Sequence, residues 1–196
     1  MALPLLWLGA AAISALTVKG LSDDRKTQQK QRKHFYKPQT LADLSEHESV
    51  IATYPTDLFD TEALVKPVVG AIVCCAIGGI LEHTGIWVDD DTIIEMDGQG
   101  LIKPISSRRF TAERSGGKIF IACDSNARPL FSDVAAQRAL EQIFLCQHYD
   151  MINNNCHQFL WQCFNPHDTS LTTFKELNQR IAHHFDRKIY WDVCDC

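Results

Sequence analysis

The sequence predicts an α+β fold, in which a small antiparallel sheet carries packed helices and follows a hydrophobic N-terminal helix. Three observations predict this class. Short β-branched apolar runs lie between residues 68 and 123, an acidic turn at residues 89–91 separates two of them, and apolar residues recur at helical spacing in residues 132–146 and 156–164. The chain has 196 residues, 45% of them hydrophobic and 22% charged, which leaves room for one domain of about 100–150 residues.

The N-terminus contains an apolar segment, residues 3–18, that has no charged side chain. Its length is near the minimum of roughly 17–25 residues for a bilayer span. Seven cations follow it: Lys19, Arg25, Lys26, Lys30, Arg32, Lys33 and Lys37. Cations on this side predict a single-pass anchor over residues 1–20 with the main domain in the cytoplasm. A cleaved signal peptide and a buried helix of the domain are the alternatives.

Residues 21–66 are polar and are interpreted as a linker before the folded domain, residues 67–165. Strands are expected in the apolar run 68–80, which ends at Gly78-Gly79, and at residues 83–88, 92–96, 101–105 and 118–123. Ser132 is a good N-cap for a helix over residues 132–146. A second helix is expected over residues 156–164 and would end before Pro166. Residues 166–196 are interpreted as a C-terminal extension.

Charge and cysteine content argue against nucleic-acid binding, a disulfide-stabilised fold and a structural metal site. The net charge is −5, with no general basic excess, so no nucleic-acid partner is expected. The eight cysteines include an adjacent pair, Cys74-Cys75, and members of apolar runs, which favours reduced thiols over disulfides. There is no paired CxxC motif, so we expect no structural metal, and no cofactor is expected. Cys194 and Cys196 could bind a metal together with His183-His184, but we interpret these residues as an exposed tail.

Cys156 is the strongest candidate for chemistry. It follows Asn153-Asn154-Asn155 and opens the last predicted helix, and Asn is a strong N-cap. The sulfur would then lie in the first turn, where unpaired amides and the helix dipole favour thiolate and can stabilise an oxyanion. The alternative is an inert, packed core cysteine.

His83 and Glu95 lie on the two predicted strands of the hairpin. Strand side chains alternate between faces, so a turn near Asp89 brings the two residues opposite or diagonal to each other on one face. A carboxylate there can hold one imidazole N–H and leave the other nitrogen for a thiol.

Together these segments resemble the lecithin–retinol acyltransferase domain, a group similar to the NlpC-like cysteine peptidases but circularly permuted. The resemblance rests on HTGIWV from His83, IIEMDGQG from Ile93 and NNNCHQF from Asn153, and it covers roughly Pro67 to Phe164. It implies a permuted papain-like fold with Cys156 as the nucleophile and His83 as its base.

Two positions depart from the family pattern. Glu95 stands where the third triad member is often a second His, and a carboxylate can perform the same orienting task. His157-Gln158 follows the nucleophile where many members have Glu-His, so His157 is not carried over as catalytic. Asn155 matches the family's Asn, for which we expect a capping or oxyanion role.

The resemblance implies a cysteine-dependent acyltransferase or hydrolase that acts through a thioester on a phospholipid or another acyl ester or amide. The membrane would be the partner of residues 3–18 and the basic cluster. The alternatives are an NlpC-like cysteine peptidase or amidase, a catalytically inactive membrane-tethered adaptor, and a thiol that senses redox state without turnover.

Overall fold

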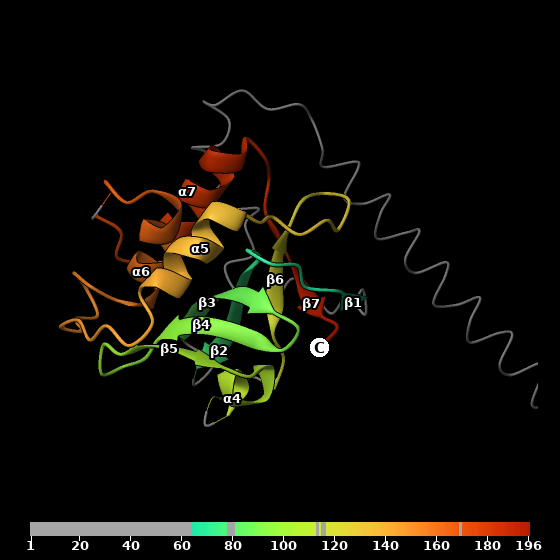
Figure 1. Ribbon diagram of the computed structural model, residues 1–196. Helices are drawn as coiled ribbons and strands as arrows, with labels where there is room; N and C mark the ends of the chain where they lie inside the picture. Colours follow the sequence, from blue (N-terminus) through green and yellow to red (C-terminus); the bar gives the residue numbers. More distant parts are fainter. Residues whose placement is uncertain (1–63, 78–80, 113, 115–116, 169) are drawn as a thin grey trace, which may run out of the picture. The chain divides into compact units, whose positions relative to one another are not determined.

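The computed structural model describes residues 64–77, 81–112, 114, 117–168 and 170–196. These residues form a seven-stranded sheet in the order β1-β7-β6-β2-β3-β4-β5, accompanied by four helices (Figure 1). The strands are β1 (Leu64–Val65), β2 (Ile72–Ile77), β3 (Leu81–Asp89), β4 (Thr92–Met96), β5 (Ile102–Ile105), β6 (Phe120–Cys123) and β7 (Tyr190–Cys194). The helices are α4 (Ser107–Thr111), α5 (Asp133–Glu141), α6 (Cys156–Phe164) and α7 (Phe174–Phe185).

The predicted N-terminal helix, residues 1–20, and nearly all of the predicted linker, residues 21–66, lie outside the described residues. Within the described part of the chain, no helix is both long enough and apolar enough to cross a membrane.

The α+β class is confirmed, but the sheet is larger than predicted and is mixed rather than antiparallel. Neighbouring strands are antiparallel except β1 and β7, which run parallel with Leu64 opposite Val193. Both β7 and α7 belong to residues 166–196, which we expected to be an extension. Because β7 lies between β1 and β6, the boundary drawn at residue 165 does not separate this segment from the domain.

Of the two C-terminal elements, α7 has a clear sequence pattern and β7 does not. All five residues of β7 are buried, so this strand lacks the apolar–polar alternation of a half-exposed strand. Helix α7 begins with a capping box: the Thr173 hydroxyl accepts the backbone N–H of Glu176, and the Glu176 carboxylate accepts the backbone N–H of Thr173. The spacing of these two residues can be recognised in the sequence.

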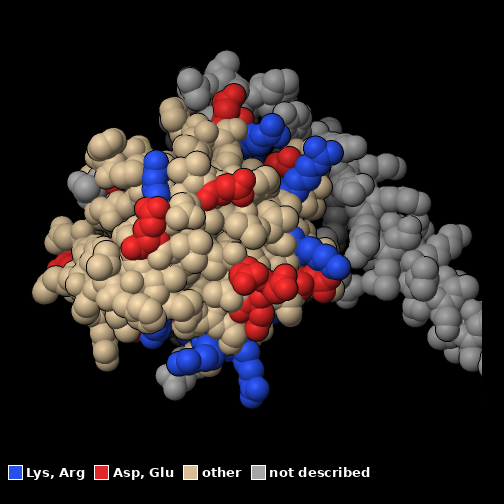
Figure 2. All heavy atoms as spheres, viewed as in Figure 1, with Lys and Arg blue, Asp and Glu red and all other residues tan. Residues whose placement is uncertain are grey.

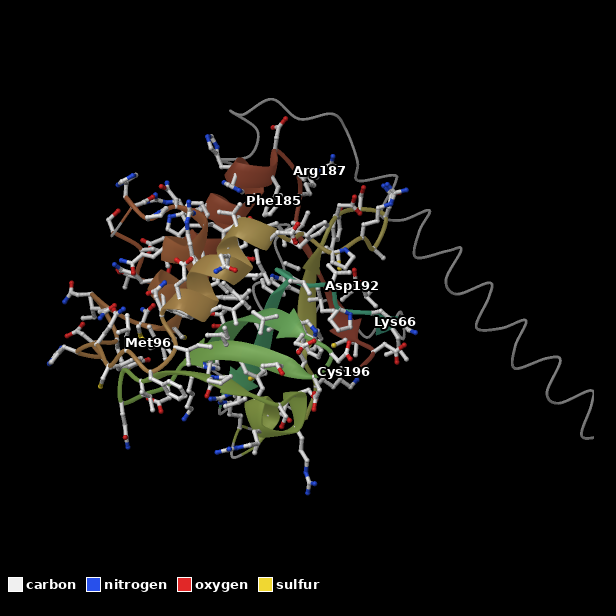
Figure 3. All side chains as sticks on the ribbon, in the orientation of Figure 1. Lys66, Met96, Phe185, Arg187, Asp192 and Cys196 are labelled. Atoms are coloured by element: carbon white, nitrogen blue, oxygen red, sulfur yellow. The ribbon has the colours of Figure 1, made fainter. Side chains whose placement is uncertain are left out.

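Alternation along the strands gives the sheet two apolar faces. One is covered by α5, α6 and α7, and Figure 3 labels Met96 where β4 meets this helical layer. Its strand residues include Ile72, Cys74, Ile86, Ile94 and Met96. The other face contains Phe110 of α4 together with Val73, Cys75, Trp87 and Ile93. The sheet is thus buried on both sides, as a mixed sheet with long apolar runs requires.

Gly85 holds the centre of the β3–β4 hairpin, where it pairs with Glu95. A β-carbon there would lie 2.6 Å from Ile93 Cγ2, 2.9 Å from the Ile94 carbonyl oxygen and 3.1 Å from the Phe110 ring. The missing side chain therefore lets α4 pack directly on the hairpin.

We predict that Gly85→Ala lowers the free energy of unfolding by about 1–3 kcal/mol, because the new methyl group overpacks the hairpin against a backbone oxygen that cannot move cheaply. Urea denaturation followed by far-UV circular dichroism measures this change. Gly98→Ala is the matched control, since a β-carbon at Gly98 meets no atom within 4 Å. Equal stability of both variants would contradict the tight packing at Gly85.

Candidate active site

Cys156 is the first residue of α6, as predicted, and it is only 4% exposed. It lines a cavity of about 270 Å³ that also contains His83 and His157. The other lining residues are Glu82, Tyr149, Met151, Asn155, Thr172, Thr173 and Phe174. The sulfur is therefore buried in the protein but faces a space large enough for part of a small substrate.

Asn155 caps the helix, as expected. Its side-chain oxygen accepts the backbone N–H groups of His157 and Gln158, each at 3.0 Å. Its amide nitrogen donates to the carbonyl oxygens of Met151 and Thr172 at 2.8 and 2.7 Å, so it ties the cap to the loops on both sides. The amides of residues 157 and 158 are consequently occupied and cannot serve an oxyanion, which corrects the broader expectation of free first-turn amides. The N–H of Cys156 itself is not held by Asn155.

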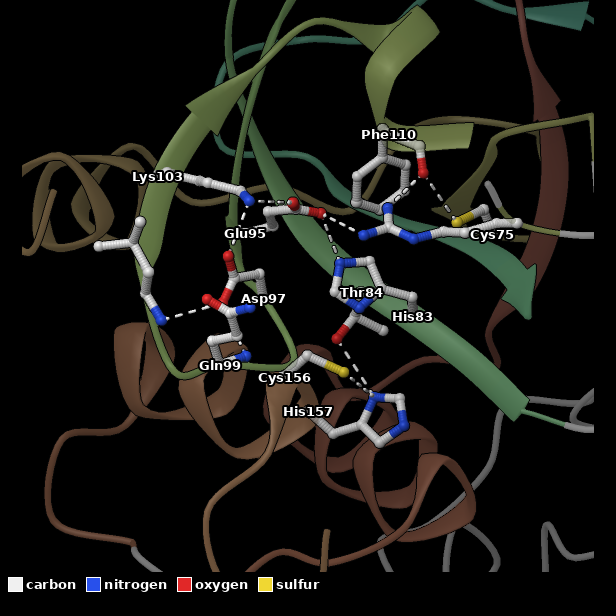
Figure 4. A network of polar contacts seen from close by, with 12 residues as sticks. Cys75, His83, Thr84, Glu95, Asp97, Gln99, Lys103, Phe110, Cys156 and His157 are labelled. Carbon is white, nitrogen blue, oxygen red and sulfur yellow. Dashed lines mark hydrogen bonds and ion pairs between the residues drawn. The ribbon is translucent and has the colours of Figure 1, made fainter. Parts of the chain in front are cut away.

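His83 and Glu95 meet across the hairpin. His83 Nε2 lies 2.7 Å from Glu95 Oε2 (Figure 4). Since Gly85 pairs with Glu95, His83 lies diagonal to the carboxylate on the same face, which is one of the two arrangements that the sequence predicts. The imidazole also packs on Phe110, with ring centroids 5.2 Å apart. Contacts on two sides therefore fix the ring and leave its Nδ1 atom available.

Glu95 is a buried carboxylate surrounded by cations. It is 2% exposed, and Arg114 donates from Nη2 to its Oε2 at 2.9 Å, while Lys103 Nζ lies 3.9 Å from its Oε1. Burial on its own raises the pKa of the Glu95 carboxyl, but the hydrogen bonds and charges of His83 and Arg114 outweigh burial and lower this pKa. The carboxylate thus stays charged and can orient an imidazolium.

Arg114 is a residue that the sequence analysis missed. It follows α4, its Nη1 donates to the Phe110 carbonyl oxygen, and its guanidinium lies 5.2 Å from the Phe110 ring centroid. Cys75, opposite His83 in the β2–β3 pairing, donates to the same carbonyl oxygen at 3.4 Å. Burial raises the pKa of the Cys75 thiol to about 12, so this second nearby sulfur remains protonated.

The Cys156 sulfur interacts with two imidazoles. Burial on its own raises the pKa of this thiol, but the charges of His157 and His83 and hydrogen bonds with both rings outweigh burial and hold the pKa well below the ordinary thiol value. Burial also lowers the pKa of His83, yet the charge of the Cys156 thiolate and hydrogen bonds with Cys156 and Glu95 outweigh it and raise this pKa. A thiolate–imidazolium pair is the protonation state that these shifts favour.

His157 is closer to the site than the sequence analysis expected. Its Nδ1 atom lies 3.9 Å from Cys156 Sγ and 3.2 Å from Thr84 Oγ1 (Figure 4). Thr84 is fully buried on the helix-covered face of β3 and fixes the ring, which also packs on Phe174 at 5.6 Å between centroids. In the sequence, this contact is indicated only by the adjacent Cys156 and His157 at the start of the predicted helix, because a ring in the first turn can fold back toward the sulfur of its neighbour.

Comparisons of the chain with protein-family models, with curated proteins and with solved structures find no match.

We predict that iodoacetamide alkylates Cys156 nearly as fast at pH 7 as at pH 9, because the thiolate is lost only as the pH falls through a lowered pKa. An ordinary thiol with a pKa of about 8.5 is mostly protonated at pH 7 and reacts correspondingly slowly. Peptide mapping by mass spectrometry gives the rate at each cysteine.

Two comparisons sharpen this alkylation experiment. His83→Gln should shift the Cys156 profile toward higher pH, since it removes one of the two positive partners. Cys163 should stay unlabelled in the folded protein, because it is fully buried and burial raises the pKa of its thiol to about 12. A Cys156 profile with its midpoint near pH 8.5 in the wild-type protein would refute the thiolate–imidazolium pair.

Proposed function

We propose that this chain is a cysteine-dependent acyltransferase or hydrolase that forms a thioester at Cys156, with a phospholipid or another acyl ester as its substrate. The single observation that carries the proposal is the surroundings of one buried sulfur. It opens a capped helix, faces a cavity and interacts with His83, whose other nitrogen is held 2.7 Å from a buried carboxylate. Nucleophile, base and orienting group in this order are the constellation of nucleophilic acyl transfer.

The first half-reaction uses the thiolate–imidazolium pair. The Cys156 thiolate attacks the acyl carbonyl carbon and forms a carbon–sulfur bond. The carbonyl oxygen becomes an oxyanion, for which the N–H of Cys156 at the positive end of α6 is a suitable donor. When the carbon–oxygen ester bond breaks, His83 gives its proton to the leaving alkoxide, and a neutral imidazole and a thioester remain.

The second half-reaction restores the enzyme. His83 removes a proton from water or from an acceptor hydroxyl or amine, which attacks the thioester carbonyl. The thiolate leaves, and the imidazolium pairs with it again. Water as the acceptor gives hydrolysis, and another nucleophile gives acyl transfer, so the balance depends on which acceptor reaches the cavity.

Glu95 and His157 have different roles in this scheme. Glu95 accepts the Nε2–H of His83, which leaves Nδ1 for the interaction with Cys156 and stabilises the imidazolium during each proton transfer. No hydrogen bond to a carboxylate orients His157 among the described residues, although the Glu82 carboxyl lines the same cavity and interacts with its charge. The Nδ1 atom of His157 is shared with the Thr84 hydroxyl. We assign it to stabilising the thiolate before substrate binds, which makes it a positioning residue rather than the base.

Three features favour a membrane lipid and a permuted papain-like enzyme. The resemblance of the His83, Glu95 and Cys156 segments to the lecithin–retinol acyltransferase domain is the first, and the meeting of these segments at the start of a helix packed on a sheet is the second. The apolar residues 3–18 with the following basic cluster are the third, because such a tether would keep a cytoplasmic domain beside its lipid substrate.

We predict that a radiolabelled acyl phospholipid leaves a hydroxylamine-sensitive thioester on the wild-type protein and none on Cys156→Ala. His83→Gln should lower kcat/KM by about 10²–10⁴-fold through loss of the base. Glu95→Gln should lower it less, by roughly tenfold to a hundredfold, because its amide oxygen can still accept the imidazole N–H but carries no charge.

Cys146→Ala is the control for the thioester experiment, since Cys146 is an exposed thiol outside the cavity and should leave labelling unchanged. Acyl label on Cys156→Ala equal to that on wild type would exclude Cys156 as the nucleophile. Cleavage of amide peptides without any thioester from lipid would instead favour the peptidase or amidase alternative.

We predict that His157→Gln lowers kcat/KM by about tenfold and raises the pH at which kcat/KM falls on the acid side. The wild-type thiolate is present above the lowered pKa of Cys156 and is lost as the pH falls through it, so removing one stabilising charge moves this limb upward. The pH dependence of kcat/KM on a soluble thiol-reactive ester measures the shift. A loss as large as that of His83→Gln would show that His157, and not His83, is the base.

A further inference from the structure

The connection between α5 and α6, residues 142–155, exposes large apolar side chains, and one of them, Met151, lines the cavity. Phe144 is 76% exposed, Leu145 52%, Met151 63% and Ile152 64%. We call these four residues the apolar lip. Solvent-exposed apolar residues are ordinary when they are scattered, but four on one short connection next to a cavity need an explanation.

The fold holds the first half of the lip rigidly in this exposed state. Phe144 has a left-handed backbone with φ of 70°, which is unusual for a bulky residue. Its N–H donates to the Ile102 carbonyl oxygen at 2.8 Å, and the N–H of Ile102 donates to the Leu145 carbonyl oxygen at 2.9 Å. The segment is thus hydrogen-bonded to the edge strand β5, and a strained residue is kept with its ring in solvent.

The second half of the lip is a turn built by Asp150. One carboxylate oxygen of Asp150 accepts the N–H groups of Ile152 and Asn153, each at 2.8 Å, and the backbones of Asp150 and Asn154 exchange two hydrogen bonds of 2.9 Å. Asn154 also joins the two halves, because its side-chain nitrogen donates to the His148 carbonyl oxygen at 2.8 Å and to Gln147 at 3.2 Å.

The lip reaches the candidate active site directly. Met151 lines the same cavity as Cys156, and its carbonyl oxygen accepts from the side chain of Asn155, the helix cap. A surface that covers the lip would therefore meet the mouth of the cavity as well.

We propose that the apolar lip inserts into the surface of a lipid bilayer and presents the cavity to the acyl lipids there. The backbone N–H groups of Phe144, Leu145 and Ile152 are already paired inside the protein. Such pairing favours insertion into hydrocarbon, because unsatisfied backbone groups are costly there. Residues 142–155 contain no Lys or Arg and only one acidic residue, Asp150, whose oxygen is occupied by the turn. Figure 2 shows the region over these loops as largely uncharged.

A bilayer fits these observations better than a protein partner. Protein interfaces usually surround an apolar centre with a rim of polar groups that bond to the partner. In this connection the side chains of Asp150, Asn153 and Asn154 instead form hydrogen bonds within the connection itself. The lack of cations also predicts that the lip enters neutral phosphatidylcholine and depends little on salt. This proposal rests on the proposed function for its choice of lipid, but insertion can be measured without catalysis.

The direct test places Trp at the lip of the inactive, full-length Cys156→Ala protein. Ile152→Trp should add fluorescence, relative to its parent, that shifts to shorter wavelength and is quenched by vesicles of brominated phosphatidylcholine. Val69→Trp is the matched control, because Val69 is 46% exposed and precedes β2 on the part of the chain that lines a second cavity with Lys66 and Cys196. Figure 3 shows Lys66 and Cys196 at the β1–β7 side of the sheet, the edge opposite β5.

The second test separates membrane insertion from chemistry. The double variant Phe144→Ser/Ile152→Ser should lose roughly tenfold or more of its turnover on vesicle lipid, because two apolar side chains no longer leave water. It should retain its turnover on a soluble short-chain ester, and Leu64→Ser/Val69→Ser should retain both. Absence of lipid quenching at Ile152→Trp, in neutral or anionic vesicles, would overturn the lip proposal and point to a protein interface, whereas quenching without any thioester at Cys156 would overturn only the proposed function.

Discussion

A charged carboxylate inside a β-sheet is costly unless partners compensate for its lost water, and the candidate site depends on how Glu95 meets this constraint. Its neighbours are His83 on the next strand, Arg114 after α4 and, farther away, Lys103 on β5. His83 and Arg114 supply the hydrogen bonds and charges that outweigh the burial of the carboxylate. The orientation of the His83 ring therefore contributes to folding as well as to the chemistry, and Phe110 packs on that ring.

The Cys156 thiolate is a second buried negative charge, and it too needs partners that compensate for its burial. Burial opposes a thiolate, and the cap of Asn155 takes two of the first-turn amides that would otherwise favour one. The charges of the two imidazoles are the largest compensation. The helix dipole adds to them, because Cys156 lies in the first turn of α6, where the dipole acts. The thiolate and the His83 imidazolium thus stabilise each other, and Glu95 stabilises the imidazolium. Removing any member leaves a buried charge without its partner, so the three groups behave as one unit.

Much of this could be predicted from local rules, and the rest could not for identifiable reasons. Strand alternation and the acidic turn place His83 and Glu95 on one face, and the Asn-Cys step places the sulfur at a helix start. Arg114 carries no periodic signal, because it lies outside the helices and strands of the described residues. The part played by His157 depends on a rotamer fixed by Thr84, a residue 73 positions away in the chain, and no helical spacing encodes that contact.

The site also reverses the usual distribution of residues in a soluble domain. Charged and polar groups that normally face water, such as Glu95 and His83, are buried, while Phe144 and Ile152, which would stabilise a core, are in solvent. Local violations of this kind concentrate where a protein is selected for function rather than stability. Here the buried polar groups and the exposed apolar groups meet at one cavity. His83 of the sheet lines it, and so does Met151, which is an exposed apolar residue of the loop. An acyl ester has a polar carbonyl group and apolar chains, and such a substrate needs buried charge at one end of its site and an apolar surface at the other.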